Sequence, residues 1–349
     1  MNRKYFSASL LLILLLLVMP FSLGGCSKDS PKRAVKKELN LIKELDESTI
    51  KAFVSYEDMM SSHSSSSDVG IETTEAVKRF FQNFDYKIKS SSVEDKKATV
   101  HVEITNLDTH ALAKDICLAL VKKGTGSGSS ENMTLNSYFA LLGDVLSENT
   151  YDLVTTEADI KLLKTEDGWM IQNTDQLEDD LVSGFITYLK DPYLVTPEEI
   201  INVVMEGLKE KSPDQWKSYL NMQDIFSTYS QNYEKTDDAL AVQLSKHISY
   251  KILSVTEDQE QESASAKITI TSLDMKSVLK RYQELLMNYA STTESIRASS
   301  SELADETASL LAQALAENTD TTDTEVTIHF TNNGSSWEMQ LNEDFTNAL

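Results

Sequence analysis

Apolar residues recur along the chain with two periods, and each period appears twice in the same order. A spacing of three or four residues predicts a leading amphipathic helix in two places. The apolar positions are Val35, Leu39, Ile42 and Leu45 in the first, and Ile200, Ile201, Val204 and Leu208 in the second. Strict alternation follows in "ATVHVEIT" (98–105) and in "AKITIT" (266–271). Alternation predicts strands of a sheet with one buried face and one polar face.

Short matched stretches show that the second half of the chain repeats the first. "DYKI" (85–88) matches "SYKI" (249–252), "ITNLD" (104–108) matches "ITSLD" (270–274), and "TEDGWMIQ" (165–172) loosely matches "NNGSSWEMQ" (332–340). Leu45 and Phe53 likewise match Leu208 and Trp216. The matched stretches keep the same order in both halves, and the number of residues between the two members of a pair increases slowly along the chain. Small loop insertions in the second copy would produce this increase. We therefore expect two tandem domains, 34–190 and 196–349, joined by a linker at 191–195, where prolines interrupt helix.

The plan expected for each copy is three helices, a hairpin, a helical pair and a closing hairpin. The second helix carries Phe53 or Trp216, and the closing hairpins turn at Asp167-Gly168 and at 332–336. Polar stretches at 122–132 and 290–302 interrupt the helical pairs and are predicted to be loops. This order predicts an α+β fold, in which helices cover one face of a curved four-stranded antiparallel sheet.

The same order, with a Gly-Trp signature in the closing hairpin, is similar to the nuclear-transport-factor-two-like or cystatin-like group. The resemblance covers both copies and implies a cone-shaped sheet. Small domains of that kind recur in bacterial lipoproteins of uncharacterised function. The helical pair between the hairpins departs from the usual pattern of the group.

The first residues have the three parts of a secretory signal. Arg3 and Lys4 precede an apolar run, 10–18, and the segment closes with Leu23-Gly24-Gly25-Cys26. That ending resembles the lipobox of bacterial lipoproteins. The resemblance implies removal of residues 1–25 and a diacylglyceryl thioether on Cys26, followed by a polar tether, 26–33. Two acyl chains anchor a protein stably, so we expect a bacterial cell-membrane protein on the extracytoplasmic face, in either an inner or an outer membrane.

The chain is strongly acidic. It has 55 acidic and 32 basic residues and a formal charge of -23, which loss of Arg3 and Lys4 would take to -25. Such a chain repels phosphate backbones, so nucleic acid is not an expected partner. The membrane, through the lipid, and a protein or small-molecule ligand are the expected partners.

Familiar catalytic and metal-binding motifs are missing from the sequence, so no cofactor is expected. Besides Cys26, Cys117 stands among apolar residues and is predicted to be a small buried side chain. The five histidines show no metal-ligand spacing, and no glycine-rich loop precedes a helix. An acidic turn at Asp320, Asp323 and Glu325 lacks the pattern of an EF-hand.

Two matched polar pairs have both a structural and a catalytic interpretation. Asp108 and Asp274 each precede a helix and are predicted to be N-caps. Tyr86 and Tyr250 each begin a strand and are predicted to be aromatics at the rim of the core. Some enzymes of the similar superfamily pair a tyrosine with an aspartate in the cone, which would assign Asp85 with Tyr86 or Asp108 to catalysis here.

Three functions follow as hypotheses, of which a non-enzymatic scaffold that binds a ligand or a protein is the preferred one. It assigns no catalytic residue and no metal ligand, and Cys26 is its lipid-anchor site. The first alternative is an isomerase or hydrolase with an Asp/Tyr site in a cone pocket. The second is a transporter-associated solute-binding lipoprotein, which would need parallel strands in βαβ units.

Overall fold

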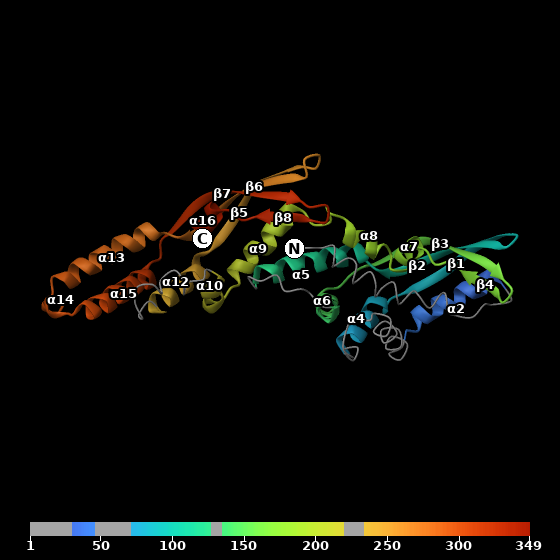
Figure 1. Ribbon diagram of the computed structural model, residues 1–349, viewed down its shortest axis with the longest axis horizontal. Coiled ribbons are helices and arrows are strands. Elements are labelled where there is room, and N and C mark those ends of the chain that lie inside the picture. Colours follow the sequence, from blue (N-terminus) through green and yellow to red (C-terminus); the bar gives the residue numbers. More distant parts are fainter. Residues whose placement is uncertain (1–29, 46–70, 127–134, 220–233) are drawn as a thin grey trace. The chain divides into compact units, whose positions relative to one another are not determined.

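The computed structural model describes residues 30–45, 71–126, 135–219 and 234–349. The chain divides into two compact units (Figure 1). The first comprises residues up to Ala119 together with 131–194, and the second comprises Val195–Leu349 together with 120–130.

In the first unit, helices alternate with the strands of one sheet. Its elements are α2 (Pro31–Lys43), α4 (Ile71–Phe81), β1 (Asp85–Glu94), β2 (Lys97–Leu107), α5 (Thr109–Gly126), α6 (Leu135–Glu148), β3 (Leu153–Thr165), β4 (Gly168–Ile171), α7 (Asp175–Leu181) and α8 (Phe185–Lys190).

The second unit repeats the order of the strands, and among the described residues it differs by α10 before the sheet, by α14 in the insertion and by the lack of a counterpart to α8. Its elements are α9 (Pro197–Lys209), α10 (Pro213–Tyr219), α12 (Glu234–His247), β5 (Ser249–Asp258), β6 (Ser263–Leu273), α13 (Met275–Ala290), α14 (Thr293–Arg297), α15 (Ser300–Glu317), β7 (Thr321–Asn332), β8 (Trp337–Gln340) and α16 (Glu343–Ala348).

The two sheets have the same topology and the same register. Each is four-stranded and antiparallel, in the orders β1-β2-β3-β4 and β5-β6-β7-β8. Tyr86 pairs with Ile104 as Tyr250 pairs with Ile270, and the register shifts once in each first hairpin, after Ile88 and after Ile252. The mixed α/β architecture with two antiparallel sheets agrees with the α+β prediction. It is not the parallel βαβ arrangement that the solute-binding alternative requires.

Loop length accounts for the drift between the matched landmarks. The first hairpin turns through residues 95–96 between β1 and β2, but through 259–262 between β5 and β6. The closing hairpin is also longer in the second unit, where 333–336 replaces 166–167. In the first unit the tight turn is therefore Glu166-Asp167, one residue before the predicted pair, and Gly168 begins β4 with a φ of 133° that suits glycine.

One face of each sheet is packed under helices. In β2 the side chains of Val100, Val102 and Ile104 are buried, whereas Thr99 and His101, on the other face, are partly exposed. The leading helix α2 packs on β1, β2 and β4, and α9 packs on β5, β6 and β8. Trp169 and Trp337, in the closing strands, are both buried. The alternating strands and the amphipathic helices thus supply the two sides of each core.

Helix starts follow local sequence signals. Thr196 caps α9 in a capping box with Glu199, and Pro197 takes the first helical position. Ser30 caps α2, which begins at Pro31, three residues before the predicted start of the first repeat. Trp216 lies in α10 as expected, whereas Phe53 lies outside the described residues.

One loop prediction is wrong, and one repeated helix was not predicted. The stretch 290–302 contains α14 and the start of α15, because Thr292 caps the first and Ser299 forms a capping box with Glu302 for the second. In the stretch 122–132, α5 continues to Gly126. Each closing hairpin also leads into a short helix, α7 capped by Thr174 and α16 capped by Asn342. These helices pack on the long strands β3 and β7.

Candidate functional site

The two cysteines lie in different parts of the chain. Cys26, the predicted lipid-anchor site, lies outside the described residues, as do the signal segment and residues 26–29 of the tether. Cys117 is 3% exposed on α5, as predicted for a small buried side chain. The anchor therefore stays a prediction from the sequence.

The matched aspartates are helix caps. The carboxylate of Asp108 accepts hydrogen bonds from the backbone N–H groups of His110 and Ala111, at 3.1 and 3.0 Å. Asp274 accepts from the N–H of Lys276 at 3.0 Å and from the hydroxyl of Ser277 at 2.9 Å. These bonds, the Ser277 bond first, lower the pKa of Asp274. The capping prediction is confirmed in both units.

The matched tyrosines join the first strand of each sheet to its leading helix. The hydroxyl of Tyr86 donates to Oδ1 of Asn40 on α2 at 2.6 Å, and that of Tyr250 donates to Oδ1 of Asn202 on α9 at 2.8 Å. Burial, followed by the nearby Glu206 carboxylate, raises the pKa of Tyr250 to about 12. Each tyrosine is thus a neutral hydrogen-bond donor at physiological pH, and its role repeats with the fold.

The three residues of the enzymatic alternative have separate structural partners. Asp85 forms an exposed ion pair with Lys43 at 2.6 Å, and this contact lowers the pKa of the Asp85 carboxyl. Tyr86 bonds to Asn40, and Asp108 caps α5. Asp85 also accepts a hydrogen bond from the backbone N–H of Tyr86 at 2.9 Å, but the hydroxyl of Tyr86 donates to Asn40 on α2 and not to a carboxylate. The geometry therefore shows no aspartate–tyrosine acid–base pair of the kind that alternative needs.

Some of the remaining candidate ligands lie on the open faces of the sheets, including Asp323 and Glu325, which belong to β7 and not to the predicted acidic turn, whereas His110 and His247 lie on α5 and α12. On the first sheet His101 pairs with Asp159 across β2 and β3. On the second, His329 is exposed and Asp323 accepts from the Thr271 hydroxyl at 2.6 Å. Within the described ranges, no group of three or more histidine, cysteine, aspartate or glutamate side chains is arranged to hold a metal ion.

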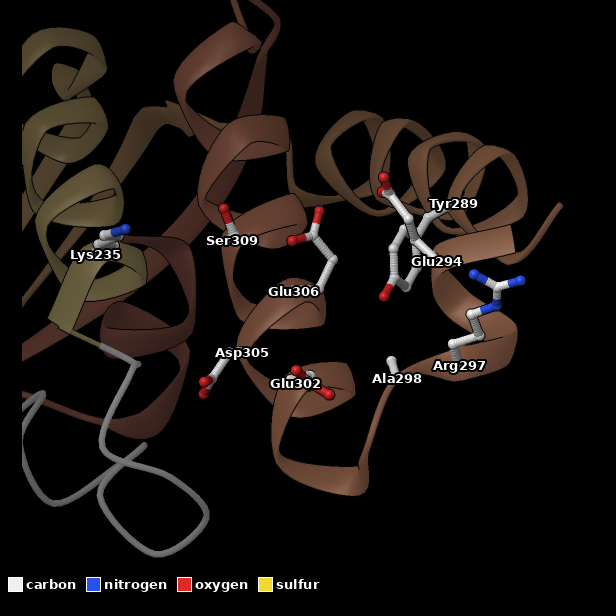
Figure 2. A pocket seen from close by; sticks show the side chains of 9 residues that line it. All are labelled: Lys235, Tyr289, Glu294, Arg297, Ala298, Glu302, Asp305, Glu306 and Ser309. Atoms are coloured by element: carbon white, nitrogen blue, oxygen red, sulfur yellow. The ribbon is translucent and has the colours of Figure 1, made fainter. Parts of the chain in front are cut away.

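An open pocket of about 620 Å³ lies among the helices of the second unit (Figure 2). One wall comes from α13 and α14, the other comes from α15, and Lys235 of α12 stands at the edge. Its lining residues are Lys235, Tyr289, Glu294, Arg297, Ala298, Glu302, Asp305, Glu306 and Ser309. Sequence reasoning missed this pocket, because its residues fall partly within the stretch predicted to be a loop.

The chemistry of the pocket is that of a solvated acidic surface. Burial, and after it the carboxylates of Glu306, Glu294 and Glu302, raise the pKa of Tyr289, so its hydroxyl stays protonated. Glu302 is committed to the capping box of α15. The lining contains no nucleophile held against a general base. The pocket therefore gives no support to catalysis.

The helices around this pocket also carry exposed apolar side chains. We call the segment from α13 to α15, residues 275–317, the helical arm. It extends away from the second sheet as a hairpin with α14 at its tip (Figure 1). α13 and α15 pack on one another, and α12 packs on α15. Large hydrophobic side chains are nevertheless exposed on the arm, namely Met275, Leu279, Met287, Ile296 and Leu303.

Comparisons with known proteins leave the family open. No family model matches the chain, and no curated protein matches it. A crystal structure of ycdA from Bacillus subtilis subsp. subtilis str. 168, named as a candidate lipoprotein, is similar with 12% identity and a TM-score of 0.26. The match covers 76% of this chain and 92% of that chain. A TM-score this low does not establish a shared fold.

The described helices were also compared with the requirements of a membrane span. None of them combines the length and the apolar character that a bilayer crossing needs.

Proposed function

We propose that the chain is a lipid-anchored extracytoplasmic protein that binds another protein and catalyses no reaction. In this proposal Cys26 carries the lipid, both units are copies of one cone-like domain, and the helical arm is the binding surface. The lipobox-like ending at Cys26 supports the anchor. The binding role rests on one observation: of the twelve large apolar side chains that are exposed in the described residues, five lie on the arm. Apolar side chains that gather on a surface are typical of interaction sites.

The packing of the sheets favours the interpretation as a scaffold rather than as a cone that binds a small molecule. The side chains of Val100, Ile104 and Ile160 on the covered face of the first sheet are buried, as are those of Ile268, Ile270 and Phe330 in the second. Apolar side chains therefore fill the place where an open cavity would hold a small molecule. The polar residues that both units share are used for caps and for the ties between helix and strand.

Metabolic labelling with a palmitate analogue tests the anchor. Wild-type protein takes the label and Cys26→Ser does not, because the thioether is the only expected site of acylation. Cys117→Ser is the matched control and keeps the label, since its side chain is buried. Label retained by Cys26→Ser would contradict the anchor.

Native gel electrophoresis of protein extracted in a mild detergent tests the binding surface. Wild type is expected to migrate as a complex larger than the single chain, and Leu279→Glu as the chain alone. Lys161→Glu, on the open face of the first sheet, is the control and keeps the complex. Identical migration of the Leu279→Glu variant and wild type would exclude the arm as the binding surface.

A further inference from the structure

The leading helix α2 is basic on its exposed side, although the chain as a whole is acidic. Residues 31–43 contain five basic residues and one acidic residue, whereas the whole chain has 55 acidic and 32 basic residues. The one acidic side chain of the helix, Glu38, is buried. The basic side chains are all exposed, namely Lys32, Arg33, Lys36, Lys37 and Lys43. The exposed side of α2 therefore carries positive charge alone.

Four of these side chains gather in the first half of the helix. Lys32 and Lys36 are four residues apart, as are Arg33 and Lys37, so each pair stands one above the other and the two rows adjoin. The buried side of α2 packs on β1, β2 and β4, so the two rows face away from the first sheet (Figure 1). Lys43, farther along, is held in an ion pair with β1. We call Lys32, Arg33, Lys36 and Lys37 the basic patch.

The corresponding helix of the second unit is acidic at the same place. The asparagines that accept from the matched tyrosines align α2 with α9. Lys36 then corresponds to Glu198, which is exposed. Lys37 corresponds to Glu199, which forms the capping box of α9 with Thr196. The repeated fold therefore does not require positive charge here, and the basic patch is a property of α2 alone.

The predicted anchor lies close to the basic patch along the chain. Cys26 is four residues before Ser30, which caps α2, so even a fully extended chain separates the two residues by no more than about 14 Å. Seven residues of helix take Lys37 about 10 Å farther. With the lipid on Cys26, the whole patch is held within about 25 Å of the bilayer surface.

We infer that the basic patch binds the anionic headgroups of the bilayer in which the chain is anchored. This inference rests on the proposed lipid at Cys26 and assigns a second membrane contact, on α2. Each Lys or Arg near an anionic surface strengthens binding by about fivefold. The lipid makes the second contact intramolecular, because it keeps the headgroups at a high effective concentration beside the patch.

The acidic remainder of the chain sets the orientation of this contact. The formal charge of -23 is repelled by an anionic surface, but the repulsion is screened over about 8 Å at physiological ionic strength. The patch at the surface is attracted, and acidic groups brought as close are repelled. Attraction and repulsion therefore favour the same arrangement, in which α2 faces the bilayer.

Fluorescence quenching of the lipidated chain in reconstituted vesicles tests the contact. Leu41→Cys places a reactive thiol one turn beyond Lys37 on the exposed side of α2, while Cys117 is buried and Cys26 is expected to be blocked by the lipid. A fluorophore on this thiol is quenched by nitroxide-labelled headgroups when α2 lies at the surface. Quenching is expected to be about fivefold stronger in vesicles with about one third phosphatidylglycerol than in pure phosphatidylcholine. Raising the salt concentration is expected to remove the difference.

Charge reversal separates the effect of the patch from that of the tether. Lys36→Glu with Lys37→Glu gives α2 the charges of α9 and is expected to abolish the difference between the two lipids. Lys161→Glu with Lys267→Glu, on the open faces of the two sheets, is the control. It changes the net charge by the same amount and is expected to keep the difference.

The outcomes distinguish this inference from the proposed anchor. Equal quenching in the two lipids, or a difference that survives the reversal of Lys36 and Lys37, overturns the inference. Flotation of the chain with both kinds of vesicle would then still support the lipid on Cys26. A chain that floats with neither kind of vesicle refutes the anchor, and the inference fails with it.

Discussion

α5 and α13 occupy the same place in two copies of one plan, but they have different surroundings. Each begins at an aspartate cap after the second strand of its sheet. α5 buries Leu112, Ala113, Ile116 and Cys117, whereas in α13 Val278 is buried and Met275, Leu279 and Met287 are exposed. The sheets, in contrast, agree in order, register and the position of the irregularity. The comparison shows that the sheet is the same in both units, whereas the inserted helices expose different side chains.

A charged side chain introduced at the matched helix positions is expected to give the largest difference between the units in lost unfolding free energy. Ala113→Asp is expected to lose about 3–5 kcal/mol of unfolding free energy, the cost of a buried charge without a partner. Leu279→Asp is expected to change the stability of the monomer by less than about 0.5 kcal/mol, as a surface substitution does. Chemical denaturation at a protein concentration at which the chain is monomeric measures both. Equal losses would mean that α13 is as buried as α5.

Truncation at matched sheet positions should affect the two units alike. Ile104 and Ile270 are both 0% exposed and both pair with the tyrosine of the first strand. Replacing either by alanine is expected to cost about 2–5 kcal/mol through lost burial and the cavity left behind. Single-tryptophan variants that keep only Trp169 or only Trp337, with Trp216 replaced in both, report the unfolding of the first and the second unit by fluorescence. A large effect in one unit with none in the other would break the equivalence of the sheets.

Glu38 is a place where the leading helices differ. When α2 and α9 are aligned on Asn40 and Asn202, which accept from the matched tyrosines, Glu38 corresponds to Ile200. The side chains of Glu38 and Ile200 are both 4% exposed. Burial raises the pKa of Glu38, and its Oε2 has no hydrogen-bond partner among the described residues. Glu38→Ile is expected to gain about 1 kcal/mol at neutral pH, because it removes a buried polar atom that lacks a partner.

The sign of the pH dependence follows from the raised pKa. The protonated form of Glu38 favours the folded state, because the pKa of its carboxyl is higher in the folded chain than the ordinary value of 4.5. Its contribution to the unfolding free energy is therefore complete below pH 4.5 and is lost as the pH rises through the folded-state pKa. Glu38→Gln is expected to flatten this part of the stability profile. The assignment would be contradicted if the unfolding free energy of the wild type rose with pH in this window and Glu38→Gln abolished that rise.

The smallest expected effect comes from the tie between helix and strand. Tyr86→Phe and Tyr250→Phe each remove one hydroxyl bond to an asparagine. Each is expected to cost about 0.5–1.5 kcal/mol, the net value of one intramolecular hydrogen bond. Thermal unfolding of the two variants measures the loss. A Tyr86→Phe variant of unchanged stability would show that this bond does not hold α2 to the first sheet.

The sequence predicted the parts of the fold that depend on local pattern. Alternation in 98–105 and 266–271 located β2 and β6, and the matched motifs located the aspartate caps. The same motifs singled out Tyr86 and Tyr250 as rim aromatics, but their hydrogen bonds to Asn40 and Asn202 were not predicted. α14 was missed because its Thr and Ser residues were read as loop composition, although Thr292 and Ser299 are caps. The short closing helices α7 and α16 have too few residues for a visible apolar period.

The proposed binding surface could not be predicted from the sequence, for a different reason. The apolar spacing of α13 at Val278, Tyr282, Leu285 and Tyr289 predicts a buried face, and that face does pack on α15. The second stripe, at Leu279 and Leu286, continues the apolar arc, and a sequence does not tell which part of such an arc a tertiary neighbour covers. The arm extends away from the second sheet (Figure 1), and the side chain of Leu279 on it is exposed.

A photo-reactive amino acid introduced in living cells tests the central claim most directly, that the protein engages its partner through α13. We predict that the probe at Leu279 gives one crosslinked species of defined mass, and that the probe at Lys161, on the open face of the first sheet, gives none. Crosslinks from Lys161 without any from Leu279 would contradict the claim and would assign binding to the sheet.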